Sequence, residues 1–232
     1  MMMQGDLVLD EARAYWDFVY YADPTHQHTT ELATLDWPPE RLREGCRTVL
    51  ADRRRISLEV QPPSEYYREV DDFNWTGKRV LEFGCGMGAD ALQLAERGAI
   101  MTVTDIVPGN VQIADRVLDG FPHTAVVLRS YDDCGLLGSF DVVFSHGVLH
   151  HIKPPLDRLA ITKLINHIVP AGRMILMVYT HVYYPQEQVN VEGPYTRGFH
   201  PMDLADRFIG VMEIESYRYV LGTTCAWVVA RK

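Results

Sequence analysis

The segment from Val80 to Gly88 constrains the fold of this chain more than any other. It reads Val-Leu-Glu-Phe-Gly-Cys-Gly-Met-Gly, a short apolar run followed by glycines at every second position. An amphipathic pattern over 89–97 then predicts a helix that Gly98 closes. A strand that turns through glycines into a helix is where a doubly wound α/β sheet binds a nucleotide-like ligand, because glycine lets a ligand approach the backbone.

The rest of the chain from residue 78 onward repeats this alternation of short apolar runs and amphipathic stretches. The last two apolar runs are separated by only three residues, so they are expected to pair antiparallel. The pattern predicts a doubly wound, Rossmann-like, seven-stranded and mostly parallel sheet with an antiparallel closing strand. The predicted strands are 79–83, 100–104, 125–128, 140–145, 173–179, 211–220 and 224–230, and the predicted helices are 89–97, 111–118, 156–168 and 203–208.

The chain changes character near residue 75. Residues 1–74 mix aromatic and charged side chains at helical spacing and are interrupted by prolines, which predicts an N-terminal arm of short helices that closes over the site as a lid. Residues 75–232 form the predicted ligand-binding domain, and within it 181–200 is a long irregular stretch, expected to be a substrate-side insertion. An aromatic stripe of this kind is more often core packing than pocket. The substrate-binding candidates in these two regions are Tyr20, Tyr21, Tyr183, Tyr184 and His200.

Composition limits the classes of partner that the chain is expected to bind. The formal net charge of -9 disfavours a nucleic-acid backbone as the main partner, and the one tight basic run, 53–55, is interpreted as a solvated helix face. The four cysteines include no Cys-x-x-Cys pair, so we expect reduced thiols and no zinc ribbon or dithiol site, and no metal is assigned. The sequence shows neither a signal peptide nor a membrane span, which favours a cytoplasmic protein. It does not indicate the oligomeric state.

The glycine spacing selects the kind of ligand. Glycines at 84, 86 and 88 lack the two-residue gap of a pyrophosphate-binding Gly-x-Gly-x-x-Gly loop. Glu82, at the end of the strand, would repel a pyrophosphate and attract an ammonium or sulfonium group. Asp105 ends the next predicted strand, where a carboxylate can accept both hydroxyls of a ribose or cap the following helix.

The series Glu82-x-Gly84-x-Gly86-x-Gly88 resembles the first motif of class I S-adenosylmethionine-dependent methyltransferases, and further matches follow in order over about 75–180. The likeness is to small-molecule members such as those of ubiquinone and menaquinone biosynthesis. The resemblance implies that the glycine loop packs on the methionine part of the cofactor and that the second acid holds the ribose. It implies the cofactor-binding residues Glu82, Gly84, Cys85, Gly86, Gly88, Asp105, Ile106, Tyr131, Asp132, Ser145 and His146.

The fourth predicted strand and the loop after it, 140–152, match this family over the longest stretch. The match places His150 and His151 near the mouth of the substrate pocket, as general base or as donors that orient the substrate. Only one of two adjacent side chains is expected to face the pocket, and a loop histidine bonded to backbone is the alternative for each. A turn at 169–173, where Ala171 replaces a family glycine, completes the series.

These features predict an enzyme that uses S-adenosylmethionine to methylate a small, apolar or aromatic molecule. Positioning of the acceptor and the methyl group would supply most of the rate, with a histidine as base where the acceptor carries a proton. Two alternatives remain: a protein that holds the cofactor without transferring a methyl group, and a methyltransferase that acts on protein or RNA. An NAD-dependent dehydrogenase conflicts with the glycine spacing and with the closing strand pair.

Overall fold

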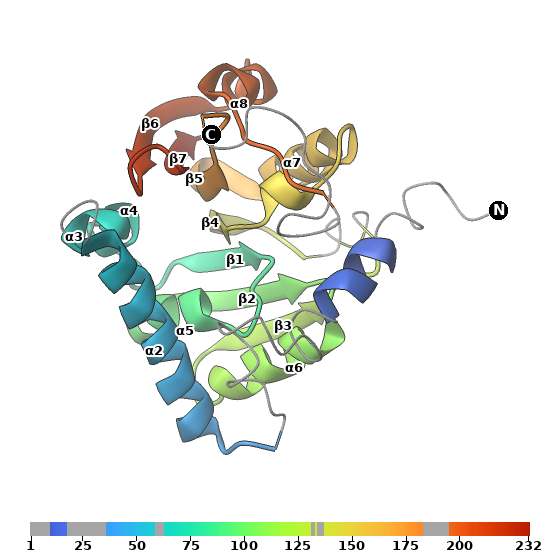
Figure 1. Cartoon of the computed structure of the whole chain (residues 1–232). Coiled ribbons are helices and arrows are strands. Elements are labelled where there is room, and N and C mark those ends of the chain that lie inside the picture. The colour runs from blue at the N-terminus through green and yellow to red at the C-terminus, as the bar shows by residue number, and fades with distance from the viewer. Residues whose placement is uncertain (1–9, 18–35, 59–62, 131–132, 134–136, 183–194) are drawn as a thin grey trace.

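A seven-stranded sheet with helices on both faces forms the molecule (Figure 1). The computed structural model describes residues 10–17, 36–58, 63–130, 133, 137–182 and 195–232. The strand order is β3-β2-β1-β4-β5-β7-β6, and β7 runs antiparallel to both of its neighbours. The predicted sheet, with its antiparallel closing strand, is therefore confirmed. The strands are β1 (Arg79–Phe83), β2 (Ile100–Asp105), β3 (His123–Val127), β4 (Phe140–His146), β5 (Ile168–Tyr179), β6 (Glu213–Val220) and β7 (Cys225–Arg231).

The helices divide between the two faces. One face is covered by α2 (Pro39–Leu58), α4 (Arg68–Asp71), α5 (Ala89–Glu96) and α6 (Pro108–Val117), and the other by α7 (Leu156–Asn166) and α8 (Pro201–Phe208). A short helix, α3 (Pro63–Tyr66), precedes α4, and a 3₁₀ turn, η2 (Leu149–His151), follows β4. Residues 10–17 are also helical. Figure 1 shows them beside the carboxyl ends of the central strands.

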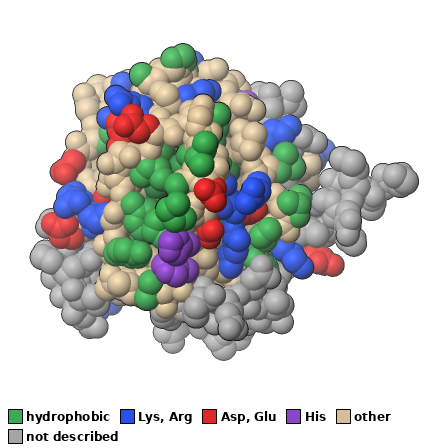
Figure 2. Space-filling model, turned by 90° about the horizontal axis from the view of Figure 1, so that it is seen from above, with side chains coloured by type: hydrophobic (Ala, Val, Ile, Leu, Met, Phe, Trp, Pro, Cys, Tyr) green, Lys and Arg blue, Asp and Glu red, His purple; other side chains and the backbone are tan. Residues whose placement is uncertain are grey.

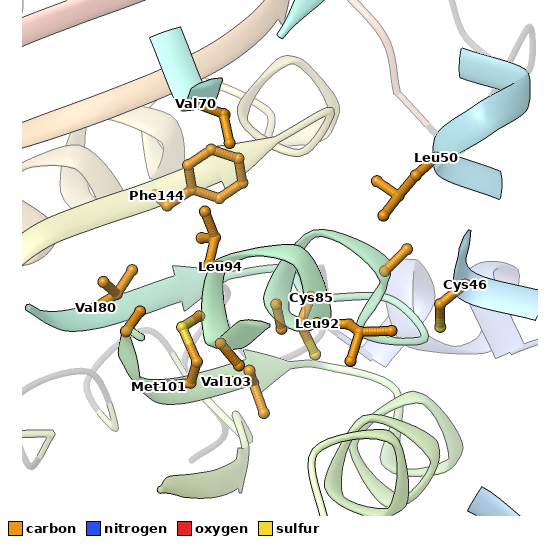
Figure 3. Close-up of a cluster of buried hydrophobic side chains, with 14 of the residues drawn as sticks. Cys46, Leu50, Val70, Val80, Cys85, Leu92, Leu94, Met101, Val103 and Phe144 are labelled. Atoms are coloured by element: carbon orange, nitrogen blue, oxygen red, sulfur yellow. The ribbon is translucent and has the colours of Figure 1, made fainter. Parts of the chain in front are cut away.

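Successive residues of the central strands enter opposite hydrophobic clusters. Val80 of β1 packs among the side chains of α5, whereas Leu81 packs on the side of α7. Figure 3 shows the first cluster, in which Phe144 of β4 and Leu94 of α5 lie close to Val70 of α4. Burial on both faces explains why the strands read as continuous apolar runs instead of alternating ones.

The N-terminal region differs from the predicted set of short helices, because α2 is one helix of 20 residues that begins at Pro39. Proline is favoured in the first turn of a helix, where its missing N–H has no helical acceptor in any case. The prolines that suggested interruptions therefore mark the two ends of this segment. Among the described residues, no helix combines the length and the apolarity that a membrane span requires.

One end of the molecule, formed by β6, α7 and α8, is seen face-on in Figure 2. Hydrophobic side chains gather in the middle of this face, with histidine, acidic and basic side chains beside them. The exposed hydrophobic residues of α8 and the turn that follows it are Met202, Ile209 and Val211.

Candidate cofactor site

A cavity of about 130 Å³ lies at the carboxyl ends of the central strands. Its floor comes from the ends of β1, β2 and β4 and from the residues that follow them, and one side is closed by the helix of residues 10–17. This is the edge at which open α/β sheets bind their ligands. The lining residues are Ala12, Trp16, Phe83, Gly84, Asp105, Ile106, Leu128, His146, Gly147, Val148, His151 and Ile152.

The glycine loop between β1 and α5 is fixed by its backbone. The amides of Gly84 and Cys85 both donate to the carbonyl oxygen of Thr104, each at 2.9 Å, which ties the loop to β2. Gly84 has φ +76°, and a Cβ there would lie 2.3 Å from a methyl group of Val148. Only glycine fits this position, both for its conformation and for its space. The absence of a side chain at Gly84 therefore makes room for Val148, and both residues line the cavity.

The other predicted loop residues have different surroundings. Gly86 and Gly88 also have positive φ values, 50° and 85°. Gly88 immediately precedes α5 and packs against Ala114 of α6. Cys85 is buried, and burial raises the pKa of its thiol well above the ordinary value, so its sulfur is a neutral packing group.

Asp105 is the buried acid at the end of β2. Its two carboxylate oxygens accept the amides of Gly86 and Val107, each at 2.9 Å. Burial raises the pKa of this carboxyl, and hydrogen bonds from those amides, from the Asn110 side chain and from the Ile106 amide oppose the rise. Asp105 therefore holds the glycine loop in place and also lines the cavity. Its neighbour Ile106 lines the same wall.

Glu82 lies beneath the loop in a polar cluster. It is 2% exposed, and its Oε2 has no hydrogen-bond partner among the described residues. Burial, followed by the nearby charge of Asp90, raises the pKa of Glu82 well above the ordinary value. A buried acceptor without a donor costs free energy, so this oxygen favours a ligand that brings a hydrogen-bond donor or a positive charge.

Asp90 and Arg53 complete the charge of this cluster. Arg53 of α2 reaches Asp90 of α5 at 2.6 Å, and Asp90 is almost completely buried. Burial tends to raise the pKa of Asp90, but the charges of His146 and Arg53 outweigh it and lower the pKa. Arg54 pairs with Asp71 of α4. The interpretation of residues 53–55 as a solvated face is thus wrong for two of the three, because α2 crosses α5 and turns those side chains inward.

His146, at the end of β4, lines the cavity and contacts Tyr66. The Tyr66 hydroxyl lies 3.0 Å from Nε2 of His146, and Asp90 lies 3.5 Å from Nδ1. Burial lowers the pKa of His146 to about 4, so the ring is neutral at pH 7. Ser145, predicted beside the cofactor, is buried and donates from its hydroxyl to the carbonyl oxygen of Phe83 at 2.9 Å, a bond between neighbouring strands.

The two adjacent histidines of η2 have different environments. His150 is 1% exposed, stacks on Tyr179 at 4.0 Å between ring centroids, and accepts the Tyr179 amide at Nδ1. Burial lowers its pKa well below the ordinary value. His151 lines the cavity, where its ring and the Trp16 ring pack edge to face with 4.9 Å between their centroids. The structure thus places one of the pair in the core and the other on the cavity wall.

Of the remaining candidates, the structure describes only His200. His200 caps α8 by accepting the amide of Met202, and its ring packs against His181 at 4.4 Å, outside the set of residues that line the cavity. The other candidates fall outside the described residues, namely Tyr20, Tyr21, Tyr131, Asp132, Tyr183 and Tyr184.

Sequence reasoning missed several residues that the fold brings to this site. Arg13 donates from Nε to the carbonyl oxygen of Ile106 at 2.8 Å and from a terminal nitrogen to that of Leu128 at 3.4 Å. It thereby joins the helix of residues 10–17 to the ends of β2 and β3. Neither Arg13, Arg53 nor Asp90 belongs to a local motif, so no signal in the sequence singles them out.

A glycine loop follows β1, an acid ends β2, and β7 is reversed between β5 and β6. Residues 80–172, about two fifths of the chain, match the family described as a methyltransferase domain. This part of the chain is therefore similar to a methyltransferase domain.

Curated relatives match the same part of the chain. A mitochondrial ubiquinone biosynthesis O-methyltransferase from Schizosaccharomyces pombe is 33% identical over 119 residues, which cover 49% of this chain and 41% of that protein. A tRNA U34 carboxymethyltransferase from Haemophilus influenzae is 29% identical over 119 residues, with 45% and 36% covered. The chain thus spans about two fifths of the length of these relatives.

Solved structures resemble the fold over nearly the whole chain. Magnesium protoporphyrin IX methyltransferase from Synechocystis PCC 6803, with bound S-adenosylmethionine, aligns with a TM-score of 0.60 at 17% identity and covers 100% of this chain and 98% of that one. The N-methyltransferase NodS from Bradyrhizobium japonicum, in complex with S-adenosyl-L-homocysteine, aligns with a TM-score of 0.58 at 15% identity and covers 99% of each chain. At these identities the likeness concerns the fold.

Proposed function

We propose that the chain binds S-adenosylmethionine in this cavity and transfers the methyl group to a small, apolar or aromatic acceptor. The observation that carries the proposal is the pairing of a side-chain-free loop at Gly84 with two buried acids, Glu82 and Asp105, in a methyltransferase domain. These groups suit a ligand with an ammonium group at one end and vicinal hydroxyls at the other.

The residues present fit that cofactor. The unpaired Oε2 of Glu82 would accept from the cationic methionine end, and Asp105, which lines the cavity, would accept the ribose hydroxyls. Ile106 and Leu128 would supply apolar contact for the adenine ring of the cofactor. Neutral His146 adds no positive charge to a site that would hold a sulfonium.

When bound, the cofactor supplies an electrophilic methyl group, so the residues of the chain have to position the acceptor and receive any proton that it loses. His151 suits proton transfer. Its Nδ1 lies 3.1 Å from the carbonyl oxygen of Tyr195, which only accepts hydrogen bonds. Nδ1 therefore carries the ring proton, and Nε2 keeps a lone pair that can accept a proton from an acceptor hydroxyl. The roles proposed for His150 and His151 thus separate, and His151 is the base.

The helix of residues 10–17 acts as the lid in this proposal. Arg13 fastens it to the ends of β2 and β3, and Trp16 covers the cavity beside His151. In this proposal the lid moves outward to admit the cofactor and then excludes water from the reaction.

An apolar or aromatic acceptor fits the lining beside His151. Trp16, Val148 and Ile152 present hydrophobic surface there, and the formal charge of -9 disfavours a polyanion. One curated relative is named for action in ubiquinone biosynthesis and another for action on tRNA. Both acceptor classes therefore belong in the test.

The test is a methyl-transfer assay with labelled S-adenosylmethionine against phenols, amines, carboxylic acids and bulk tRNA. We expect a phenol or another small apolar acceptor to be methylated. His151→Gln should then lower kcat about 100-fold or more, as expected for loss of a general base, with unchanged cofactor affinity. His123→Gln is the control, since His123 pairs with Asp115 at the edge strand β3.

Three results would change this proposal. Methylation of tRNA and of no small molecule would show that the acceptor is a nucleic acid. Full kcat in His151→Gln would show that His151 is not the general base. Tight cofactor binding with no transfer to any acceptor would favour a protein that only holds the cofactor.

A further inference from the structure

A buried carboxylate on α7 holds two arginines from outside that helix. Asp157 is completely buried, and its Oδ2 accepts Arg197 at 2.7 Å and Arg207 of α8 at 2.5 Å. Its Oδ1 accepts the amide of Arg158 at 2.7 Å. Both guanidinium groups also lie over the ring of Phe199, at 4.7 and 5.3 Å from its centroid. The cluster joins α7, α8 and the segment 195–199 that follows β5 in the described chain.

This cluster contains more positive than negative charge. The side chains of Arg197 and Arg207 are only 17% and 5% exposed, and the Nε atom of each lacks a hydrogen-bond partner within the described parts of the chain. A single buried ion pair would be neutral, whereas two arginines on one carboxylate leave a net positive charge that is costly to desolvate. Stability alone therefore does not account for two arginines on one carboxylate.

Arg197 is next to the residues that hold the proposed base. Its own amide donates to the carbonyl oxygen of His150 at 3.0 Å. The two preceding residues present the Tyr195 carbonyl oxygen and the Thr196 hydroxyl, each 3.1 Å from Nδ1 of His151. The position of this segment thus decides which nitrogen of His151 carries the proton and in which direction the ring points.

The structure assigns to Arg197, held by Asp157, the role of a positioning residue for His151. The ion pair fixes residues 195–197 against η2, so that His151 stays in the tautomer with the proton on Nδ1. This assignment rests on the proposed function, in which His151 receives a proton. Arg207 of α8 binds the same oxygen of Asp157.

The test is Arg197→Met, which removes the link to the segment and leaves Asp157 and Arg207 as a neutral pair, so the fold should be retained. We expect kcat to fall about tenfold or more, because small misplacements of a catalytic group are costly, with the Kd for S-adenosylmethionine and the KM for the acceptor within twofold. Nitrogen-15 NMR of the His151 ring, assigned by comparison with His151→Gln, should show one tautomer in the wild type and a mixture in Arg197→Met. Arg197→Lys, which keeps the charge beside Asp157, should recover most of kcat.

The matched control is Asp71→Asn. Asp71 also accepts two arginines, Arg54 at 2.7 Å and Arg97 at 2.5 Å, but it lies on α4 away from η2. It should change neither kcat nor the tautomer. A single unchanged tautomer and full kcat in Arg197→Met would overturn the assignment. The NMR measurement needs no turnover, so it judges the positioning role even where full activity of His151→Gln contradicts the proposed base.

Discussion

The two sides of the cavity are built in different ways. The side formed by the glycine loop and Asp105 comes from residues 82–106, and backbone hydrogen bonds to Thr104 and from Gly86 and Val107 hold it. The opposite side brings Trp16, His151 and the segment 195–197 together from distant parts of the chain through side-chain contacts. The comparison teaches that the cofactor side is a local property of the strand ends, whereas the acceptor side depends on how distant segments pack.

Protonation affects the buried acids and the buried histidines differently. The cofactor side carries buried acids, Glu82 and Asp105, whose pKa values are raised by burial. Two buried histidines outside that side, His146 and His150, have pKa values that burial lowers. Desolvation favours the neutral form of both the acids and the histidines, so the two kinds of group respond to pH in opposite directions.

Asp105→Ala should have the largest effect and tests whether the cofactor side is held by one carboxylate. It removes the acceptors for two loop amides as well as those for the ribose, so the Kd for S-adenosylmethionine should rise about 1,000-fold, or ~4 kcal/mol. Isothermal calorimetry measures this change. Asp105→Asn keeps one carboxyl oxygen, so its Kd for S-adenosylmethionine should lie between those of the wild type and Asp105→Ala. A Kd within tenfold of the wild type in the alanine variant would show that the loop holds its shape unaided.

Lowering the pH should destabilise the fold through His146. An unfolded histidine has a pKa near 6.5, and His146 in the fold has a pKa of about 4. The unfolded chain therefore binds more protons in this window, and stability falls as the pH drops from about 6.5 to 4. The loss from His146 is at most about 3 kcal/mol.

Urea unfolding of the free protein between pH 4 and 8 measures this loss, and His146→Gln should flatten the curve below pH 6.5. Glu82 acts in the opposite sense, because its raised pKa contributes stability that is lost as the pH rises above 4.5. Glu82→Gln should therefore be more stable than the wild type at pH 8. Parallel curves of stability against pH for the wild type, His146→Gln and Glu82→Gln would contradict the opposite effects predicted for His146 and Glu82.

Cofactor binding should release a proton from Glu82. Burial raises the pKa of Glu82 and so favours its protonated form in the free protein, whereas a bound ammonium group favours its charged form. The binding enthalpy at pH 7 should therefore depend on the ionisation enthalpy of the buffer, and Glu82→Gln should abolish this dependence. We expect the variant to bind about tenfold more weakly, or ~1.4 kcal/mol. A buffer-independent enthalpy in the wild type would mean that Glu82 is already ionised before binding.

Trp16→Ala should have the smallest effect and tests the lid. It removes the ring that covers the cavity beside His151, so S-adenosylmethionine should both enter and leave faster, by about threefold to fivefold, or ~1 kcal/mol in each barrier. Stopped-flow fluorescence gives both rates. Trp37→Ala is the matched control, since Trp37 stacks beneath Arg41 at the beginning of α2. Unchanged rates in Trp16→Ala would show that the helix of residues 10–17 does not limit access.

Much of the fold followed from the sequence because its signals are local. The apolar run 79–83 and the glycines after it predicted β1 and its turn, since buried parallel strands and positive φ values each restrict which residues can stand there. The short connection 221–223 predicted the antiparallel pairing of β6 and β7. The prolines at 38–39 were less informative, because proline both interrupts helices and begins them, as it does in α2.

The sequence by itself determined the succession of strands and helices and the antiparallel closing pair, because the signals for these elements lie in consecutive residues. Only the tertiary structure decided that Arg53 reaches Asp90, that His150 is buried while His151 lines the cavity, and that Arg197 and Arg207 share Asp157. These contacts depend on the angle and register at which separate helices and segments pack, and no local pattern of residue types encodes that geometry.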